Sequence, residues 1–190
     1  MSDRTGLSRI SMGVWRRFRR ASLKLRFPGA HWGRGCDIRW GLRLALSPRG
    51  NLHIGEEVVF ERDATLECGG ELFIGARTIF GHHCTVAAKD SIRIGHDCLI
   101  AEMVSIRDHD HCFDDFSVPI REQGSACASV TIGNGVWLAA RVVVVKGVTI
   151  GDNAIVGAGA VVTKDIPAGA IAVGVPARVV KMRPGAVTGS

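Results

Sequence analysis

The hydrophobic and polar positions of residues 130–165 repeat every six residues. Written in sixes, this segment reads VTIGNG, VWLAAR, VVVVKG, VTIGDN, AIVGAG and AVVTKD. An α-helix repeats every 3.6 residues and cannot hold a strict period of six on one face, whereas a short strand followed by a tight turn can. The pattern predicts a triangular β-solenoid with three six-residue sides and about eighteen residues in each coil. The third position of every block is aliphatic and is expected to point inward: Ile132, Leu138, Val144, Ile150, Val156 and Val162.

The same period can be followed back to Trp32, with one large interruption. Ile-Gly pairs mark one corner of the solenoid at residues 54–55, 74–75, 94–95, 132–133 and 150–151. The spacings of 20 residues fit a coil with a two-residue insertion, and the spacing of 38 fits one coil plus an excursion of about twenty residues. Cys36, Cys84 and Cys98 fall in the small apolar positions of the repeat, so we expect them to be buried core residues.

The interruption at residues 107–129 reads RDHDHCFDDFSVPIREQGSACAS. A loop of this length in a compact domain is usually functional or disordered, and insertions in solenoids cluster on a binding face. The excursion is therefore the first place to look for chemistry.

Charge and composition narrow the class of protein. The net charge of the 190-residue chain is +6, but residues 1–30 hold eight Lys or Arg against one acid, and the remaining 160 hold sixteen basic and seventeen acidic side chains. The repeat domain is thus nearly neutral, which argues against a nucleic-acid partner. No apolar run is long enough to span a bilayer or to serve as a secretory signal. Six cysteines without CxxC spacing then indicate free thiols in a cytoplasmic protein.

Three regions are predicted: residues 1–30, the β-helix domain at 31–175 and a tail at 176–190. In the first region, an apolar stripe flanked by arginines predicts an amphipathic helix or arm that caps the open end of the solenoid. The alternative is contact of residues 7–26 with an anionic membrane surface, which would place the protein at the inner membrane. The stripe consists of Leu7, Ile10, Val14, Phe18, Ala21 and Leu25.

The six-residue repeat and the ending VVTKDIPAGAIAVGVPARVV resemble the hexapeptide-repeat acyltransferases, most closely the maltose, galactoside and polysaccharide O-acetyltransferase branch. The resemblance covers roughly residues 32–175. It implies an all-β, left-handed parallel β-helix, which is an exception to the usual right-handed crossover. It also implies acetyl-CoA-dependent acetylation of a carbohydrate hydroxyl, for example on a surface polysaccharide or its lipid-linked precursor.

Acetyl transfer to a hydroxyl requires a base that removes the hydroxyl proton, and histidine is suited to this role near neutral pH. The resemblance places the base where the repeats break into the excursion, which in the segment SIRDH is His109. His111 is the second candidate, as a donor on the substrate side. Asp108 and Asp110 both remain candidates for orienting the ring. Since Cys112 and Cys127 have no evident partner base in the sequence, we expect direct transfer without an acyl-enzyme.

Coenzyme A carries phosphate charges at one end and a long pantetheine arm, so its site needs cations and a groove. The resemblance places Trp137 and Ala140 near the arm and thiol, Ala158 along the pantetheine, Thr163 and Lys164 toward the nucleotide, and Arg178 and Lys181 near the phosphates. From the repeat count we expect Lys164 and Arg178 three to four coils beyond the base, about 15–20 Å along the stack. The resemblance further implies a homotrimer with the site between subunits.

The alternative hypothesis, from another functional class, is that the protein binds a metal ion. Some γ-type carbonic anhydrases share this solenoid and bind zinc through three histidines, and His82, His83 and His96 invite the comparison. Zinc ligands must converge at about 2 Å from the ion, and the HxxxxH pair of that family is missing here. We therefore expect no metal, and we keep a γ-carbonic-anhydrase-like or non-catalytic scaffold solenoid as the second hypothesis.

Overall fold

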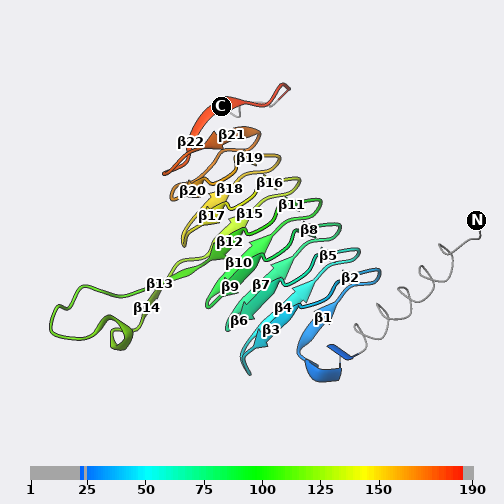
Figure 1. Ribbon diagram of the computed structural model, residues 1–190, viewed down its shortest axis with the longest axis vertical. Coiled ribbons are helices and arrows are strands. Elements are labelled where there is room, and N and C mark those ends of the chain that lie inside the picture. The colour runs from blue at the N-terminus through cyan, green and yellow to red at the C-terminus, as the bar shows by residue number, and fades with distance from the viewer. Residues whose placement is uncertain (1–21, 24, 186–190) are drawn as a thin grey trace, which may run out of the picture.

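The computed structural model describes residues 22, 23 and 25–185, and these form a β-solenoid of three parallel sheets (Figure 1). The left-handed parallel β-helix implied by the family resemblance is confirmed. The first sheet holds six strands in the order β1 (Ala30–Trp32), β4 (Asn51–Ile54), β7 (Glu71–Ile74), β10 (Ser91–Ile94), β15 (Val130–Ile132) and β18 (Thr149–Ile150).

The other two sheets complete the triangle. The second sheet runs β2 (Asp37–Ile38), β5 (Val59–Phe60), β8 (Ile79–Phe80), β11 (Leu99–Ile100), β16 (Trp137–Leu138), β19 (Ile155–Val156), β21 (Ala170–Val173) and β22 (Arg178–Met182). The third runs β3 (Arg43–Leu46), β6 (Thr65–Cys68), β9 (Thr85–Ala88), β12 (Ser105–Arg107), β17 (Val143–Val144) and β20 (Val161–Val162). We call the turn after each first-sheet strand the first corner, and those after second- and third-sheet strands the second and third corners.

The core is the column of inward-facing side chains that the period of six predicts. Ile132, Leu138, Val144, Ile150, Val156 and Val162 are all buried, as are the corresponding residues of the earlier coils except Leu44 of the first coil, which is half-buried. Phe60 and Phe80 stack inside the second sheet with ring centroids 5.0 Å apart. Because each strand alternates inward and outward residues, one face of every sheet is left for other contacts.

The first corner is tight enough to require glycine. A Cβ built on Gly75 would lie 2.5 Å from the backbone of Gly95 in the next coil, and one on Gly95 would lie 2.5 Å from the carbonyl oxygen of Gly133. These contacts are far shorter than a Cβ tolerates, so the Ile-Gly pairs follow from close stacking of successive corners.

The cysteines of the repeat are core residues, as expected. Cys36, Cys84 and Cys98 are buried, and no disulfide joins cysteines of the described residues. The Cys84 thiol donates to the carbonyl oxygen of Ala101 at 3.0 Å, and the Cys98 thiol donates to that of Gly133 at 3.1 Å. Burial raises the pKa of Cys84 to about 11, so this thiol stays protonated and satisfies a corner carbonyl instead of reacting.

The two ends of the solenoid are closed differently. At the C-terminal end, β22 pairs antiparallel with β21, so the second sheet continues past residue 175 into the segment predicted as a tail. At the N-terminal end, Leu23 and Phe27 pack against the core. Leu25 of the predicted amphipathic stripe is described and is exposed, whereas the rest of the stripe, most of the proposed membrane-contact segment 7–26 and most of the 1–30 region lie outside the described residues.

An aromatic column covers the outer face of the first sheet. The rings of His31 and His53 stack with centroids 4.4 Å apart, those of His53 and Phe73 stack at 4.9 Å, and the Arg93 guanidinium lies 4.9 Å from the centre of the Phe73 ring. The parallel register places these residues on neighbouring strands of one row. Burial, followed by the positive charge on His31, lowers the pKa of His53 from 6.5.

This column predicts a loss of stability in acid. Because the pKa of His53 is lower in the folded than in the unfolded state, the unfolded chain binds more protons as the pH falls below 6.5. The contribution of His53 is therefore fully present above that pH and is lost as the pH falls through the folded-state pKa. Urea unfolding between pH 7.5 and 5 should show a smaller decline for His53→Phe than for the wild type. The variant His83→Asn, at an exposed corner residue, is the control and should keep the wild-type slope; an unchanged slope in His53→Phe would refute the assignment.

Candidate functional site

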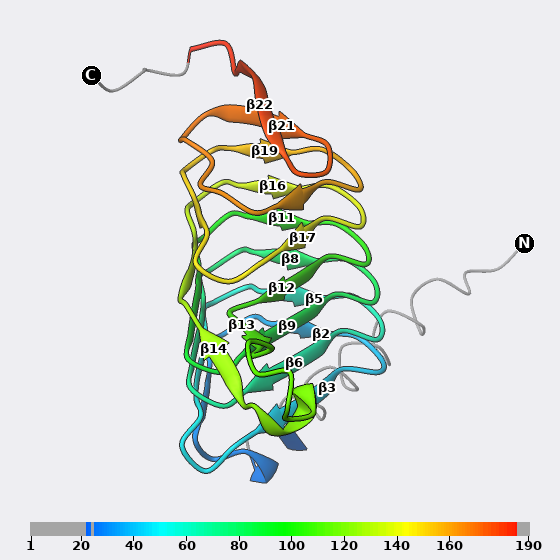
Figure 2. The same cartoon turned by 90° about the vertical axis from the view of Figure 1, so that its left-hand side faces the viewer.

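The excursion leaves the solenoid at the third corner and returns to the same corner. Strand β12 ends at Arg107, Asp108 follows, and the chain then forms a two-stranded antiparallel hairpin of β13 (His109–His111) and β14 (Ser125–Cys127), with a short 3-10 helix, η1 (Ile120–Glu122), in between. The hairpin projects from the side of the stack in Figure 1 and faces the viewer in Figure 2. The predicted loop is therefore partly an ordered strand pair, whose first residue is His109.

Asp108 anchors the base of this hairpin. Its side chain is completely buried, and its two carboxylate oxygens accept hydrogen bonds from the backbone N–H groups of Lys89 at 2.9 Å and Asp90 at 2.8 Å. Its own carbonyl oxygen accepts from the N–H of Ala128 at 2.8 Å. A buried carboxylate needs such donors, because desolvation without them is costly. Asp108 thus connects the excursion to the corner of the preceding coil.

The same carboxylate holds the imidazole of His109. Nδ1 of His109 lies 2.9 Å from Oδ1 of Asp108, and the His109 side chain is 24% exposed. An ionised carboxylate accepts hydrogen bonds but cannot donate them, so Nδ1 carries the proton in this pair. Nε2 is then left with a free lone pair, which is the atom and the state that a general base requires.

The structure also separates the roles of the two acidic neighbours of His109. Oδ2 of Asp110 lies 2.6 Å from Nζ of Lys146, an ion pair that fixes the hairpin to the third corner of the next coil. Asp110 therefore points to Lys146, and Asp108 is the residue that orients His109. His111 is exposed and lies two residues further along β13, on the same side of the strand as His109.

A cavity of about 220 Å³ lies beside His109 on the outer face of the third sheet. Ala87 and Ala88 are almost fully buried there, whereas Lys89 and Glu67 are exposed. The sequence did not indicate Glu67 or Lys89, because they occur at outward repeat positions where charged residues are ordinary. The lining residues are Glu67, Gly69, Ala87, Ala88, Lys89 and His109.

The residues predicted to bind coenzyme A fall into two groups within one chain. Ala140 and Ala158 occupy the second corner of successive coils, where the N–H of Gly159 donates to the carbonyl oxygen of Ala140 at 2.9 Å. Trp137 lies on β16, the strand that leads into this corner, and is 46% exposed. Arg178 and Lys181 lie on β22 at the end of the same sheet.

Thr163 and Lys164 lie elsewhere, at the third corner. They follow β20, which is next to β17 and two strands from β12, so they share the corner from which the His109 hairpin departs. Both are exposed. The seven predicted residues thus lie in two places, five at the second corner or on the second sheet and two at the third corner, and they form no single site in one chain.

The expected spacing along the stack was wrong for Lys164. Two strand spacings separate β12 from β20, which is about 10 Å rather than 15–20 Å. The excursion leaves and re-enters at one corner, so its residues lengthen the sequence without adding height to the solenoid.

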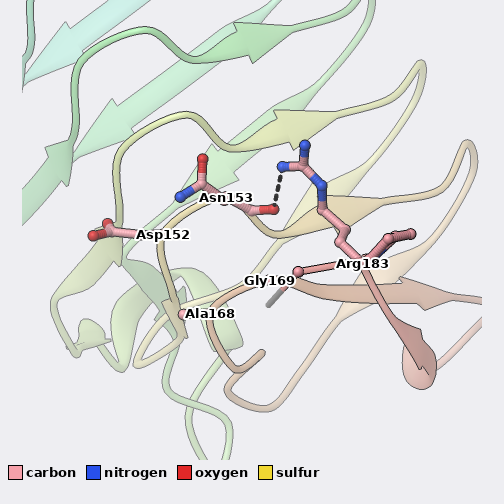
Figure 3. A pocket seen from close by; sticks show the side chains of 7 residues that line it. Asp152, Asn153, Ala168, Gly169 and Arg183 are labelled. Atoms are coloured by element: carbon pink, nitrogen blue, oxygen red, sulfur yellow. Dashed lines mark hydrogen bonds between the residues drawn. The ribbon is translucent and has the colours of Figure 1, made fainter. Parts of the chain in front are cut away.

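A larger cavity of about 310 Å³ lies at the first corner near the C-terminal end (Figure 3). Asp152, Asn153, Ala168 and Gly169 line it, and Nη1 of Arg183 donates to the carbonyl oxygen of Asn153 at 2.9 Å. It contains none of the predicted catalytic or coenzyme-binding residues. Although it is larger than the cavity beside His109, it lies at a different corner of the solenoid, so we do not assign the catalytic site to it.

The histidines considered as metal ligands do not converge within the described residues. His82 and His83 have ring centroids 6.5 Å apart, and Nδ1 of His96 lies 2.7 Å from Oδ2 of Asp97. In the part of the chain that the structure describes, no three His, Cys, Asp or Glu side chains are grouped so as to hold a metal ion. The helical residues in that part include no segment long and apolar enough to cross a membrane.

Comparison with known proteins agrees with the repeat. Residues 129–164 match the family of bacterial transferase hexapeptide repeats (six repeats). Over 153 residues the chain is 35% identical to a probable acetyltransferase of Mycobacterium tuberculosis, an alignment that covers 80% of this chain and 49% of the relative. The chain thus spans about half the length of this curated relative.

Solved structures share the fold. A maltose O-acetyltransferase from Clostridium difficile 630 is 28% identical with a TM-score of 0.58, covering 80% of this chain and 69% of that one. The polySia-specific acetyltransferase NeuO is 26% identical with a TM-score of 0.55, covering 80% and 78%. AntD, an N-acyltransferase from Bacillus cereus solved with dTDP and coenzyme A, has a TM-score of 0.73 at 20% identity over 84% and 88% of the two chains, which shows the fold alone.

Proposed function

We propose that the chain is a hexapeptide-repeat acyltransferase and that it transfers an acetyl group from acetyl-CoA to a hydroxyl group of a carbohydrate. The observation that carries this proposal is the buried Asp108 carboxylate that holds His109 beside an open cavity. The similarity to a maltose O-acetyltransferase and a polysialic-acid acetyltransferase supports a carbohydrate acceptor. The acceptor is a surface polysaccharide or its lipid-linked precursor.

In the proposed reaction, Nε2 of His109 takes the proton of the acceptor hydroxyl as its oxygen attacks the thioester carbonyl carbon. The tetrahedral intermediate then collapses, the bond between carbon and sulfur breaks, and the departing coenzyme A thiolate takes the proton from Nε2. Asp108 stabilises the imidazolium that exists between these two steps, because its carboxylate accepts the Nδ1 proton in a hydrogen bond. Asp108 is a positioning residue, and His109 is the catalytic residue.

We place the acceptor in the cavity beside His109. Glu67 accepts hydrogen bonds from sugar hydroxyls there, and Lys89 donates them, because both side chains line the cavity and both are exposed. The backbone of Lys89 also holds Asp108, so the acceptor and the base share one rigid corner. His111, further along the same side of β13, is proposed as a donor to the acceptor.

Coenzyme A binding requires a second copy of the chain in this proposal. Trp137, Ala140, Ala158, Arg178 and Lys181 lie near the second corner or on the second sheet, whereas Thr163, Lys164 and His109 lie at the third corner. An extended coenzyme between two neighbouring solenoids would contact the second corner of one and the third corner of the other. Cyclic closure of three such contacts gives a homotrimer.

The outer face of the second sheet supports this assembly. One continuous apolar row runs along it through strands β5 to β21, in parallel register. Ile79, Leu99 and Trp137 in this row are 39%, 52% and 46% exposed. Exposed apolar patches of this kind mark protein–protein contacts. The full row is Val59, Ile79, Leu99, Trp137, Ile155 and Ile171.

The proposed phosphate contacts predict a change in affinity more than in rate. Lys164→Ala and Arg178→Ala should each raise the KM for acetyl-CoA roughly tenfold or more, because a charged hydrogen bond contributes about 1.5–3 kcal/mol. The kcat should change little, since the phosphates lie far from the thioester and bind equally in the ground and transition states. Thiol-release kinetics with acetyl-CoA and its 3′-dephospho analogue measure both effects.

The control for these variants is Arg183→Ala at the first corner, whose guanidinium donates to Asn153 (Figure 3). This variant also removes one positive charge, but at the first corner, where no coenzyme contact is proposed. Its KM for acetyl-CoA should therefore match that of the wild type. If all three variants behave alike, or if Lys164→Ala and Arg178→Ala discriminate against the dephospho analogue as strongly as the wild type does, the proposed phosphate contacts are wrong.

A further inference from the structure

Cys127 lies directly across the hairpin from His109. The register of β13 and β14 pairs His109 with Cys127, Asp110 with Ala126 and His111 with Ser125. Residues opposite one another in an antiparallel pair project to the same side, so the thiol and the imidazole share one face of the hairpin. In the sequence these two residues are eighteen positions apart in a segment without periodicity, which is why the pairing could not be predicted.

The hydrogen-bond pattern makes this pair a close one. The N–H of Ala128 donates to Asp108, and the N–H of Cys112 donates to Gly124, at 2.8 and 3.1 Å. Hydrogen-bonded and non-hydrogen-bonded pairs alternate along an antiparallel ladder, so the pair of His109 and Cys127 is a non-hydrogen-bonded one. In such pairs the Cα atoms are only about 4.5 Å apart and the side chains are at their nearest.

Three groups therefore lie at the foot of the hairpin: a buried carboxylate, an imidazole bonded to it and, opposite the imidazole in the strand register, an exposed thiol. A thiol becomes nucleophilic when an adjacent base takes its proton, and a third group that orients the base completes the arrangement. The other thiols lack this setting. Four are buried in the repeat core, and Cys112 on the same hairpin lies opposite Gly124, which offers no base.

We propose that Cys127 is a self-acylation site: when acyl-CoA is bound and no carbohydrate acceptor is present, the acyl group moves from coenzyme A to the Cys127 thiol. This inference rests on the proposed function, because it uses the same donor and the same base. The acceptor hydroxyl that attacks the thioester carbonyl must lie beside Nε2 of His109. A thioester carbonyl in that position is also near Cys127, which lies opposite His109 in the hairpin.

The step balances without any further reactant. Nε2 of His109 takes the thiol proton, and the Cys127 sulfur forms a bond to the thioester carbonyl carbon. The bond from that carbon to the coenzyme A sulfur breaks, and the coenzyme A thiolate takes the proton from Nε2. One thioester is exchanged for another, so no oxidant, reductant or energy source is needed. The acylated side chain then stands beside the base, where it occupies the space of an acceptor hydroxyl.

Intact-protein mass spectrometry after incubation with acetyl-CoA alone tests this proposal. The wild type should gain the mass of one acetyl group, on the peptide that contains Cys127, and neutral hydroxylamine should remove it as it does a thioester. Cys127→Ala should not be labelled, whereas Cys112→Ala, the matched control on the same hairpin, should be labelled like the wild type. His109→Ala should slow labelling by about 10²-fold, as expected for the loss of a general base.

The outcomes also separate this inference from the proposed function. Turnover with a sugar acceptor but no label on Cys127 overturns the self-acylation site and leaves the acetyltransferase standing. A label on Cys127 with no turnover on any acceptor supports the site and counts against the acceptor class. Equal labelling of Cys112 and Cys127, or labelling whose rate ignores His109, overturns the inference, because the thiol would then react through exposure alone.

Discussion

Replacing His109 with alanine should lower kcat by about 10²-fold or more while leaving acetyl-CoA binding nearly unchanged. The reason is the position of its Nε2, which is free because Nδ1 is engaged by a buried carboxylate at 2.9 Å. Steady-state thiol release gives kcat, and titration of coenzyme A gives the binding constant. Asp108→Asn should also lower kcat, since an amide no longer fixes the tautomer of the ring.

His111→Ala is the matched control for this prediction, because His111 lies on the same strand, two residues away. It should retain most of the wild-type kcat and change mainly the KM for the acceptor. Full activity in His109→Ala together with an inactive His111→Ala would move the role of base two residues along the hairpin. Thermal unfolding of Asp108→Asn must accompany the kinetics, because Asp108 also accepts two backbone hydrogen bonds.

Leu99→Asp should dissociate the proposed trimer and abolish most of the activity. Leu99 stands in the middle of the apolar row on the second sheet and is 52% exposed in the single chain. Burying an unpaired carboxylate costs several kcal/mol, and a trimer would bury three of them. Light scattering should give three times the 20.3 kDa chain mass for the wild type and the mass of one chain for the variant.

The control places the same charge on another face. Thr131→Asp changes an exposed residue on the first sheet and should leave both mass and activity as in the wild type. A second experiment mixes His109→Ala subunits with Arg178→Ala subunits. Some sites of the mixed trimers would then combine an intact His109 from one chain with an intact Arg178 from its neighbour, and these sites should recover activity. A wild-type protein that scatters as a single chain at assay concentration and is fully active would exclude the shared site.

The sequence predicts the repeat region well because every block of six residues contains its own strand and corner, so the pattern starts again at each corner. Each strand is short and each corner is tight, so an inward residue such as Leu138 is determined by its place within a block of six, and its burial does not depend on distant pairing. The buried thiols of Cys84 and Cys98 followed from the same register. The position of the excursion was equally predictable, because an Ile-Gly spacing of 38 residues equals one coil of about eighteen residues plus about twenty inserted residues.

What the sequence could not predict lies where this period is absent. The choice of Asp108 over Asp110 depends on backbone N–H groups of the preceding coil, which no local pattern reveals. The pairing of His109 with Cys127 depends on the turn between β13 and β14, and the antiparallel return of β22 depends on the chain reversal after β21. The separation of Lys164, at the third corner, from Arg178, on β22 of the second sheet, likewise appears only once the coils are stacked.

Whether the protein is a carbohydrate O-acetyltransferase is decided by measuring release of coenzyme A thiol from acetyl-CoA with a panel of carbohydrate acceptors, free and lipid-linked, together with mass spectrometry of the products. At least one carbohydrate should raise thiol release above the acceptor-free rate. An O-acetylated sugar should accumulate in equal amount, and His109→Ala should lose both. An N-acetylated product, or thiol release that no carbohydrate stimulates, would contradict this assignment.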